Sequence, residues 1–451
     1  MQTYDVIVIG AGPAGEVVAG RLADGGLEVA LVERELVGGE CSYWACMPSK
    51  ALLRPQELAG EIERVPGVSG GELDVATILT RRDEVIHDLD DSAQLPWLEE
   101  RGVTLIRGTA QIEGKRKVSI GDEQLEARKA VVLATGSGAA MPPIPGLKEA
   151  KPWTNREATT AKQVPERLVI LGGGVVGTEL AQAWRSLGSA VTLIEGERRL
   201  LPREETFACE QVTEALEAAG VEVRTGRKAA SVERADDGTV TVTLEDGSTA
   251  TGDELLAAVG RRPRSDGLEQ LGIEAGKPVE VDRHFRHEDH PWLYAIGDVN
   301  GRVLLTHMGK YQARAVADHI MGKETATEHG ADGPLSPRVI FTDPQVSAVG
   351  HTLASAEQAG LNVRAVDAGT SGNAGGSFYG RNAAGSARIV IDEDRGVIVG
   401  ATFTGFETHE MLHAATIAIV AEVPLDRLWH AIPCFPTRSE LWLRLLETAG
   451  L

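Results

Sequence analysis

Short, strongly apolar runs alternate with amphipathic helical patterns twice along this chain. The apolar run Tyr4–Ile9 leads through a glycine-rich turn into a helical pattern at Val17–Leu22, and a second apolar run follows at Val29–Val32. The same order returns in residues 167–194. Continuous apolar runs of this length indicate strands buried on both faces, and their alternation with helices predicts βαβ units in a parallel sheet.

The rest of the pattern predicts further strands and two long helices. Helical character is expected from about residue 50 to about Gly102, and the polar residues Arg81, Arg82, Asp83 and Glu84 of this region are expected to form a solvated face. A polar, glycine-rich stretch at Gly322–Gly333 predicts a domain boundary. Further strands are expected at Val103–Arg107, Lys117–Ile120, Ala130–Ala134, Leu255–Val259, Ala387–Ile391 and Val397–Phe403, and helices at 305–320 and Thr408–Val420.

Each βαβ unit carries a dinucleotide fingerprint. The turns read GAGPAG at 10–15 and GGGVVG at 172–177, and an acid follows each first glycine after 33 − 10 = 23 and 195 − 172 = 23 residues, Glu33 and Glu195. Such glycines allow a tight turn and close approach of the backbone to a pyrophosphate, and the acid can accept from a ribose hydroxyl. Two fingerprints predict two dinucleotides, and the chemistry that commonly needs both is hydride transfer between a nicotinamide and a bound flavin.

Composition and charge narrow the class of protein. The chain has 451 residues, too many for one core, so two or three domains are expected. Its 45 Lys and Arg against 66 Asp and Glu leave a net charge of −21, which argues against nucleic acid or an anionic membrane as a partner. No apolar run reaches the roughly 18 residues of a membrane-spanning helix, and no secretory leader is recognised. We expect a cytoplasmic protein without membrane insertion.

Two of the four cysteines lie together in segment 38–50, GGECSYWACMPSK. Cys46, with Pro48 and Lys50 behind it, fits the first turn of a helix, where orphan N–H groups and the helix dipole favour a thiolate. Two thiols this close can open and close a disulfide. A structural disulfide is the weaker interpretation, because cytosolic chains rarely keep one.

Segment 38–50 resembles the redox-active motif of the class I pyridine nucleotide-disulfide oxidoreductases, the family of dihydrolipoamide dehydrogenase, glutathione reductase and mercuric reductase. The resemblance covers almost the whole chain. It extends through segments 134–137 (ATGS), 142–146 (PPIPG), 260–263 (GRRP), 293–299 (LYAIGDV) and 338–345 (RVIFTDPQ).

The resemblance implies an α/β fold with two Rossmann-like domains, for FAD and NAD(P), and a C-terminal α+β dimerisation domain. The expected boundaries are 1–150 for the first part of the FAD domain, 151–270 for the NAD(P) domain, 271–330 for the second, central part of the FAD domain and 331–451 for the interface domain. It also implies a homodimer whose active sites each combine two chains, so that a small electron acceptor meets residues of both.

The resemblance also assigns roles to residues of this chain. Cys46 would be the thiolate beside the flavin, Cys41 the outer, attacking thiol, and Lys50 would pair with Glu179; no metal site is expected. Together with the fingerprints, it assigns FAD to Gly10, Gly12, Pro13, Ala14, Gly15, Glu33, Arg34, Gly39, Glu40, Cys41, Lys50, Ala110, Thr135, Gly136, Ser137, Asp298, Leu305, Thr306 and His307. The nicotinamide dinucleotide is assigned to Gly172, Gly174, Val175, Val176, Gly177, Glu195 and Gly260.

Glu195 favours NAD over NADP, because a carboxylate accepts from a 2′-hydroxyl and repels a 2′-phosphate. Arg198 and Arg199 follow closely and could bind such a phosphate, so NADP stays an alternative.

The chain departs from the family in its C-terminal motif. The family's disulfide reductases carry His-Pro-Thr-x-x-Glu there, and this chain has Phe435 in place of the histidine, with Glu440 retained. A phenyl ring cannot protonate a departing thiolate, and loss of a general acid typically costs roughly 10²–10⁴ in rate. Efficient turnover of lipoamide or glutathione disulfide is therefore not expected. His430, or His409 and His413 on one helix face, could replace the acid. Cys434 is expected to be neutral and buried, and the alternative is a third thiol of the site that binds a soft metal or relays a disulfide.

Four functions stay open from the sequence. The first is a flavin reductase whose acceptor needs no histidine, namely a quinone, a soft metal ion or a low-pKa disulfide. The second is a dihydrolipoamide dehydrogenase that uses another base. The third, a soluble transhydrogenase, is disfavoured by the intact Cys41 and Cys46. The fourth is a non-catalytic, redox-sensing flavoprotein.

Overall fold

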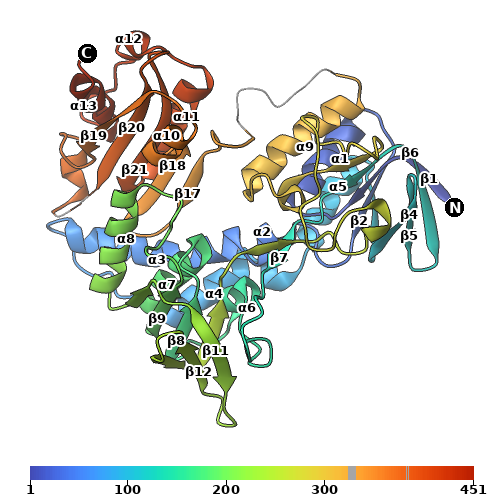
Figure 1. Ribbon diagram of the computed structural model, residues 1–451, viewed down its shortest axis with the longest axis horizontal. Coiled ribbons are helices and arrows are strands. Elements are labelled where there is room, and N and C mark those ends of the chain that lie inside the picture. The colour runs from blue at the N-terminus through green and yellow to red at the C-terminus, as the bar shows by residue number, and fades with distance from the viewer. Residues whose placement is uncertain (324–331, 382, 384) are drawn as a thin grey trace. The chain divides into compact units, whose positions relative to one another are not determined.

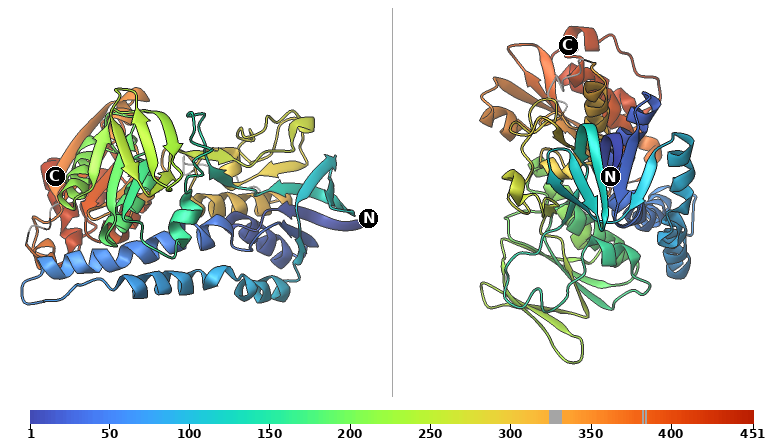
Figure 2. Two further views of the ribbon diagram at one scale, coloured as in Figure 1. Left: turned by 90° about the horizontal axis from the view of Figure 1, so that it is seen from below. Right: turned by 90° about the vertical axis from the view of Figure 1, so that its right-hand side faces the viewer.

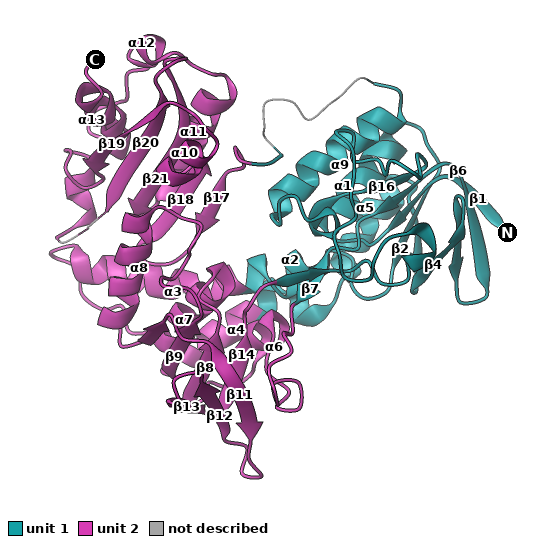
Figure 3. Cartoon of the chain, viewed as in Figure 1, with its two compact units in different colours: residues 1–48, 83–139, 261–333 teal, residues 49–82, 140–260, 334–451 magenta. Residues whose placement is uncertain are grey.

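The computed structural model describes residues 1–323, 332–381, 383 and 385–451. The chain divides into two compact units, which Figure 3 colours separately. Unit 1 comprises residues 1–48, 83–139 and 261–333, and unit 2 comprises residues 49–82, 140–260 and 334–451. The expected boundary at Gly322–Gly333 lies largely outside the described residues.

Unit 1 is built on a sheet in the order β3-β2-β1-β6-β5-β4. Its strands are β1 (Gln2–Ile9), β2 (Val29–Glu33), β3 (Thr104–Arg107), β4 (Ala110–Gly114), β5 (Lys117–Ile120) and β6 (Glu123–Leu133). Strands β1, β2, β3 and β6 run parallel, and β16 (Leu293–Ala295), from far along the chain, also pairs parallel with β6. The central strands are continuous apolar runs because both faces are covered. Val6 and Val8 pack with α1 and α9, whereas Ile7 packs with residues of β4, β5 and segment 268–299, and all three are fully buried.

Helices α1 (Pro13–Asp24) and α9 (Thr306–Ile320) pack side by side in unit 1 (Figures 1 and 2). Val18, Ala19 and Leu22 of α1 share one apolar cluster with residues 313–317 of α9. Shorter elements of this unit are α2 (Gly39–Tyr43), α5 (Leu95–Glu100), β7 (Ser137–Ala139), β15 (Arg261–Pro263) and the 3₁₀ turns η1 (His87–Leu89), η2 (Ser92–Gln94), η3 (Glu269–Leu271) and η4 (Gly297–Asn300).

Unit 2 contains the second βαβ copy. Its parallel sheet has the order β10-β9-β8-β14 and is formed by β8 (Arg167–Leu171), β9 (Ala190–Glu195), β10 (Glu222–Thr225) and β14 (Glu254–Ala257). The helices are α6 (Asn155–Thr160), α7 (Val175–Ser186) and α8 (Thr206–Ala218), and a small antiparallel sheet is made by β11 (Ala229–Arg234), β12 (Val240–Leu244) and β13 (Thr249–Gly252).

The C-terminal part of unit 2 is α+β. Its antiparallel sheet has the order β17-β18-β21-β20-β19, and every residue of β21 is buried. The strands are β17 (Arg338–Ile340), β18 (Gln345–Gly350), β19 (Val363–Gly369), β20 (Ser386–Asp392) and β21 (Val397–Gly405). The helices are α10 (Leu353–Gln358), α11 (Thr408–Val420), α12 (Leu425–Leu428) and α13 (Leu441–Thr448), with 3₁₀ turns η5 (Gly376–Tyr379) and η6 (Arg438–Glu440).

One sequence expectation for residues 47–102 is confirmed and one is wrong. The region is helical as far as Glu100, as α3 (Cys46–Arg64), α4 (Val75–Val85) and α5, and between α4 and α5 three consecutive residues, His87–Leu89, have φ values of 49°, 49° and 63°. Arg82 is fully buried rather than solvated, because its guanidinium donates to the carbonyl oxygens of Thr159 and Ala161 at 2.6 and 2.8 Å. Among the described residues, no helix combines the length and apolarity that crossing a bilayer requires.

Candidate active site

The two motif cysteines form a disulfide between the end of one helix and the start of the next. Cys41 lies on α2 and Cys46 is the first residue of α3, with their Cα atoms 4.7 Å apart. The glycine pair before them fixes this segment. Gly38 and Gly39 have φ values of 110° and 58°, and a Cβ on Gly39 would lie 2.7 Å from the Cα of Gly12. The cysteine motif therefore packs directly on the first fingerprint.

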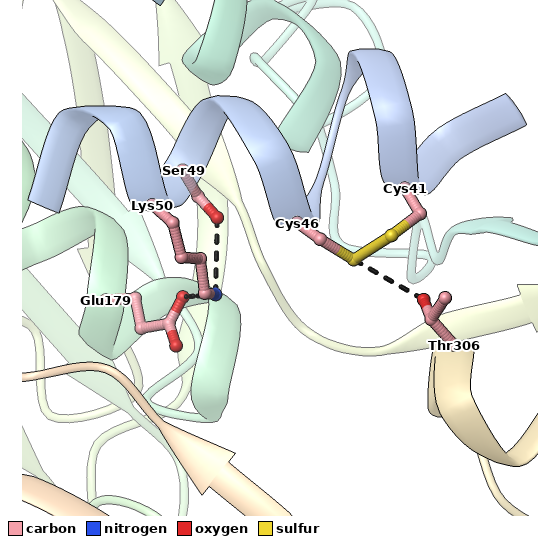
Figure 4. Close-up of a disulfide and its surroundings, with 6 residues drawn as sticks. All are labelled: Cys41, Cys46, Ser49, Lys50, Glu179 and Thr306. Atoms are coloured by element: carbon pink, nitrogen blue, oxygen red, sulfur yellow. Dashed lines mark hydrogen bonds and ion pairs between the residues drawn. A yellow bond between two sulfur atoms is a disulfide. The ribbon is translucent and has the colours of Figure 1, made fainter. Parts of the chain in front are cut away.

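The Cys46 sulfur lies at the N-terminus of two helices. It opens α3, and it is 3.4 Å from the Oγ1 of Thr306, the first residue of α9 (Figure 4). Helix N-termini favour negative charge through their free N–H groups and aligned dipoles. Once the disulfide is reduced, this position favours the thiolate of Cys46.

A second polar cluster lies in unit 2 and involves Lys50, four residues beyond Cys46 on α3. The Lys50 ammonium is 2.7 Å from Glu179 on α7, whose side chain is 5% exposed (Figure 4). The other carboxylate oxygen of Glu179 accepts from the backbone N–H of Phe341 at 2.9 Å, and the ammonium also lies 4.7 Å from the centre of the Phe341 ring. Both oxygens of the buried carboxylate thus have a donor, which holds the Lys50 side chain in place.

Both fingerprints have the geometry of a pyrophosphate cradle. Gly10 and Gly172 have φ values of 102° and 104°, and a Cβ at either would lie 2.4 Å from a carbonyl oxygen of a neighbouring strand's end. In contrast, a Cβ on Gly12 or on Gly174 would meet no atom within 4 Å. These middle glycines border free space at a helix N-terminus, which fits two bound dinucleotides.

The two acids have matching environments. One oxygen of Glu33 accepts from the N–H of Ala11 and the other from the N–H of Glu35, both at 2.7 Å. Glu195 accepts in the same way from the N–H of Gly173 and of Glu197. Each acid is thereby tied to the glycine turn of its own fingerprint, and its remaining lone pairs can accept from a ribose hydroxyl.

The other residues assigned to FAD lie in unit 1, except Lys50. Ser137 donates to Asp298 at 2.5 Å, and Thr135 donates to the carbonyl of Arg264 at 2.7 Å. Glu40 pairs with Arg264 at 2.8 Å. Leu305 immediately precedes α9, and His307 follows Thr306 in the first turn of this helix. Gly136 has a φ of 69°, Arg34 follows β2, and Ala110 begins β4.

Comparison with known proteins decides the family. Residues 4–316 match the family described as pyridine nucleotide-disulphide oxidoreductase, and residues 336–445 match its dimerisation domain. A dihydrolipoyl dehydrogenase of Haloferax volcanii is 32% identical over 99% of this chain and 96% of its own length. The chain belongs to the pyridine nucleotide-disulphide oxidoreductase family.

Two further relatives extend this comparison. A mercuric reductase of Staphylococcus aureus is 28% identical over 97% of this chain and 81% of its own length. The solved Cu(II) complex of RclA, an HOCl-induced flavoprotein disulfide reductase of Escherichia coli, is 25% identical, covers 99% of both chains and has a TM-score of 0.87. The predicted family and fold class are confirmed.

As a member of this family, the protein is a flavin-dependent pyridine nucleotide-disulfide oxidoreductase with a Cys41–Cys46 disulfide. The family uses FAD together with NAD(P)H, and its dimerisation domain supports a homodimer. FAD bound at the first fingerprint would supply electron transfer between the nicotinamide and the disulfide.

The C-terminal motif of this family member has no proton donor at position 435. The Phe435 side chain is 76% exposed on the single chain, and Glu440 keeps one buried carboxylate oxygen for which the described residues offer no hydrogen-bond partner. Cys434 is exposed, so the expectation of a buried thiol is wrong; Thr437 donates to its carbonyl at 2.6 Å and closes a turn that leaves the thiol outside. His430 is also exposed.

The two other histidines considered as substitutes lie on α11. The Nδ1 of His409 is 2.7 Å from the side-chain oxygen of Gln345, so one ring nitrogen is already engaged within unit 2. His413 is exposed.

Sequence reasoning missed two side chains of unit 1. Arg261 donates to the hydroxyl and to the carbonyl of Ser137, both at 2.8 Å, and so holds the Ser137–Asp298 pair; the GRRP segment was the available signal. Asp91 accepts from the N–H of Val37 at 2.7 Å, and no sequence pattern indicated it.

Proposed function

We propose that this enzyme takes electrons from NADH and delivers them through the Cys41–Cys46 dithiol to an acceptor that needs no protonated leaving group. Quinones, soft metal ions and low-pKa disulfides form this acceptor class. The observation that carries the proposal is Phe435, which stands where the family's disulfide reductases have their proton-donating histidine.

The acceptor class follows from what Phe435 cannot do. An ordinary alkyl thiol leaves well only when it is protonated, because its pKa is near 8.5. A metal ion takes up electrons without any proton, and a thiolate of low pKa leaves as an anion. A quinone offers a flat apolar ring, and the exposed phenyl ring of Phe435 is suited to contact one.

The named relatives support a metal ion as one such acceptor. A mercuric reductase and a Cu(II)-bound disulfide reductase both align over nearly the whole chain. Thiolates are the ligands that soft metals prefer, and reduction of the Cys41–Cys46 disulfide provides two of them.

The roles proposed for individual residues follow the same geometry. Cys46, held at two helix N-termini, is the thiolate beside the flavin, and Cys41 is the outer thiol that meets the acceptor. The Lys50–Glu179 pair supplies a fixed positive charge, which stabilises negative charge on a reduced ring. Phe435 and Glu440 are proposed to form the far wall of the acceptor site in a dimer.

The proposed donor is NADH rather than NADPH. Glu195 is held beside the second glycine turn by two backbone N–H groups, and its carboxylate would repel a 2′-phosphate. The proposed domain boundaries are supported by the pairing of β16 with β6, which joins residues near 293 to the N-terminal sheet.

The experiment that tests this function compares acceptors on the FAD-loaded enzyme. NADH oxidation is measured with lipoamide, with a benzoquinone and with Hg(II) or Cu(II) in parallel. The proposal expects turnover with the quinone or a metal ion and lipoamide turnover near background. Strong lipoamide turnover by the unaltered enzyme would contradict it and would favour a dihydrolipoamide dehydrogenase with another base; His430→Gln would then test that base.

A pair of variants sharpens this test. Phe435→His restores a proton donor and should raise lipoamide turnover by roughly 10²–10⁴. Phe435→Ala, the matched control, opens the same space without an acid and should leave lipoamide turnover near background. A flavoprotein without catalytic function would show neither rapid flavin reduction by NADH nor turnover with any acceptor.

A further inference from the structure

The turn His87–Leu89 holds a conformation that side chains disfavour. All three residues are left-handed, and the N–H of Asp90 closes the turn on the carbonyl of His87 at 2.9 Å. Left-handed backbone is costly for residues that carry a Cβ and normally occurs singly. A run of three persists only where contacts around it hold the chain in that shape, and Asp91, two residues beyond the turn, makes such contacts.

Asp91, two residues after the turn, forms an ion pair with Arg107. The Asp91 carboxylate is 2.6 Å from the guanidinium of Arg107, at the end of β3, and the same oxygen accepts from the N–H of Val37. The Asp91 side chain is 12% exposed. Arg107 also donates to the carbonyl of Glu35 at 2.9 Å. Asp91 and Arg107 together therefore bind the backbone of loop 34–38 at two points.

Loop 34–38 connects the parts of the first cradle. It follows Glu33 directly, and at its other end the N–H of Gly38 donates to the carbonyl of Ala11 at 2.8 Å, while Gly39 packs on Gly12. The chain then enters α2 with Cys41. A shift of this loop would displace Glu33, the acid assigned to the ribose, and would disturb the packing of Gly39 on Gly12.

We propose that the Asp91–Arg107 clamp retains FAD by fixing loop 34–38 over the first fingerprint. Both are positioning residues, since they act through Glu33 and Gly12 rather than on the cofactor. The proposal rests on FAD binding at the first fingerprint and is independent of the identity of the electron acceptor.

The chain offers a closely matched control elsewhere in unit 1. Asp5 also accepts from one backbone N–H, that of Glu28 at 3.0 Å, and pairs with one arginine, Arg128, at 2.8 Å. Its side chain is 17% exposed, against 12% for Asp91. Asp5→Ala therefore removes an equal set of contacts from unit 1 without touching loop 34–38.

The test measures release of FAD from purified holoenzymes by ultrafiltration over time. Asp91→Ala should release FAD about tenfold faster than the unaltered enzyme, because a hydrogen bond to a charged group is lost together with the ion pair. Asp91→Asn, which keeps an acceptor for Val37, should recover part of the retention. Asp5→Ala should stay within about twofold of the unaltered enzyme, and the KM for NADH should be unchanged in all three variants.

Release from Asp91→Ala no faster than from Asp5→Ala would overturn the proposal. Should Asp91→Ala fail to fold, Arg107→Met decides, since it keeps the Val37 hydrogen bond but loses the ion pair together with the hydrogen bond to the carbonyl of Glu35. It should release FAD roughly two- to fivefold faster. Release at the unaltered rate would contradict the clamp, whereas failure of the proposed acceptor chemistry would leave FAD release unaffected.

Discussion

The glycine turns of the two fingerprints meet the same steric limits, whereas the loops after their acids are held differently. A Cβ on Gly15 or on Gly177 would come within 1.8 Å of the carbonyl oxygen of the first glycine of its own turn. After Glu33, the loop is held by the largely buried Asp91 carboxylate. After Glu195, Arg199 instead donates to Thr206 at 2.6 Å, and a cavity of about 290 Å³ adjoins it.

This difference matches what the two sites must do. The cavity is lined by Arg198 and Arg199, by Thr206, Cys209, Glu210, Thr213 and Glu214 of α8, and by Thr225 of β10. Thr225 pairs in register with Glu195, so one lining residue of the cavity neighbours the acid of the second fingerprint. A nicotinamide dinucleotide enters and leaves in every cycle, whereas FAD stays bound. In the proposed assignment the same turn chemistry serves both, and the clamped loop after Glu33 would help to retain FAD.

The largest expected effect concerns Cys46, because only the first βαβ unit is followed by a pair of redox-active cysteines. Cys46→Ser should abolish the thiolate-to-flavin charge-transfer band of the reduced enzyme and lower acceptor turnover by about 10³-fold or more, while FAD stays bound. Absorbance spectra during NADH titration measure the band. The control is Cys209→Ser: burial raises the pKa of this α8 thiol to about 11, and its band should be unaltered. A band that persists in Cys46→Ser would refute the assignment of the thiolate.

Substitution of the middle glycines, Gly12 and Gly174, should distinguish FAD binding from nicotinamide dinucleotide binding. Gly174 borders free space, so Gly174→Val should fold but obstruct the pyrophosphate, and the KM for NADH should rise roughly 10- to 100-fold with FAD retained. Gly12→Val should instead yield protein that lacks FAD. Steady-state kinetics and the FAD content of the purified proteins check the pair. Loss of FAD from Gly174→Val would show that the copies are not independent.

Substitution of the two acids, Glu195 and Glu33, tests which of them sets the preference for NADH over NADPH. Glu195→Gln removes the charge that repels a 2′-phosphate, so the preference for NADH over NADPH, measured as a ratio of kcat/KM values, should fall by about tenfold. Glu33→Gln, its counterpart in the first copy, should leave that ratio unchanged. An unaltered enzyme that prefers NADPH would mean that Arg198 or Arg199 outweighs the carboxylate.

Much of this comparison could be predicted from the sequence, because it depends on local patterns. Glycine spacing and apolar runs located both βαβ copies, and the cysteine motif located the disulfide. The Asp91 clamp could not be found in this way, because it joins the segment after α4 to loop 34–38 through residues distant in sequence, and an aspartate in a polar stretch carries no periodic signal. Arg82 was misjudged for a related reason: its partners are backbone carbonyls at 159 and 161.

The smallest expected effect is a change in thermal stability, and it concerns the residue that follows the last glycine of each fingerprint turn. In the second copy this is Thr178, whose hydroxyl donates to the carbonyl of Gly173 at 3.1 Å. In the first copy it is Glu16, and burial raises its pKa to about 7, with Glu33 adding to the rise and Lys310 opposing it. Folding therefore favours the protonated acid, so this contribution to stability is present at low pH and is lost as pH rises through 7.

Glu16→Gln should remove this loss of stability at high pH, because the glutamine side chain is neutral at every pH. Relative to the ordinary value of 4.5, a pKa of about 7 for Glu16 lowers the free energy of unfolding by at most about 3 kcal/mol at pH 8. The variant should thus unfold at a higher Tm than the unaltered holoenzyme at pH 8, and the two should nearly coincide at pH 5. A gain of equal size at both pH values would show that the amide stabilises the turn by a contact unrelated to charge, and the first copy would then differ from the second only in its loop.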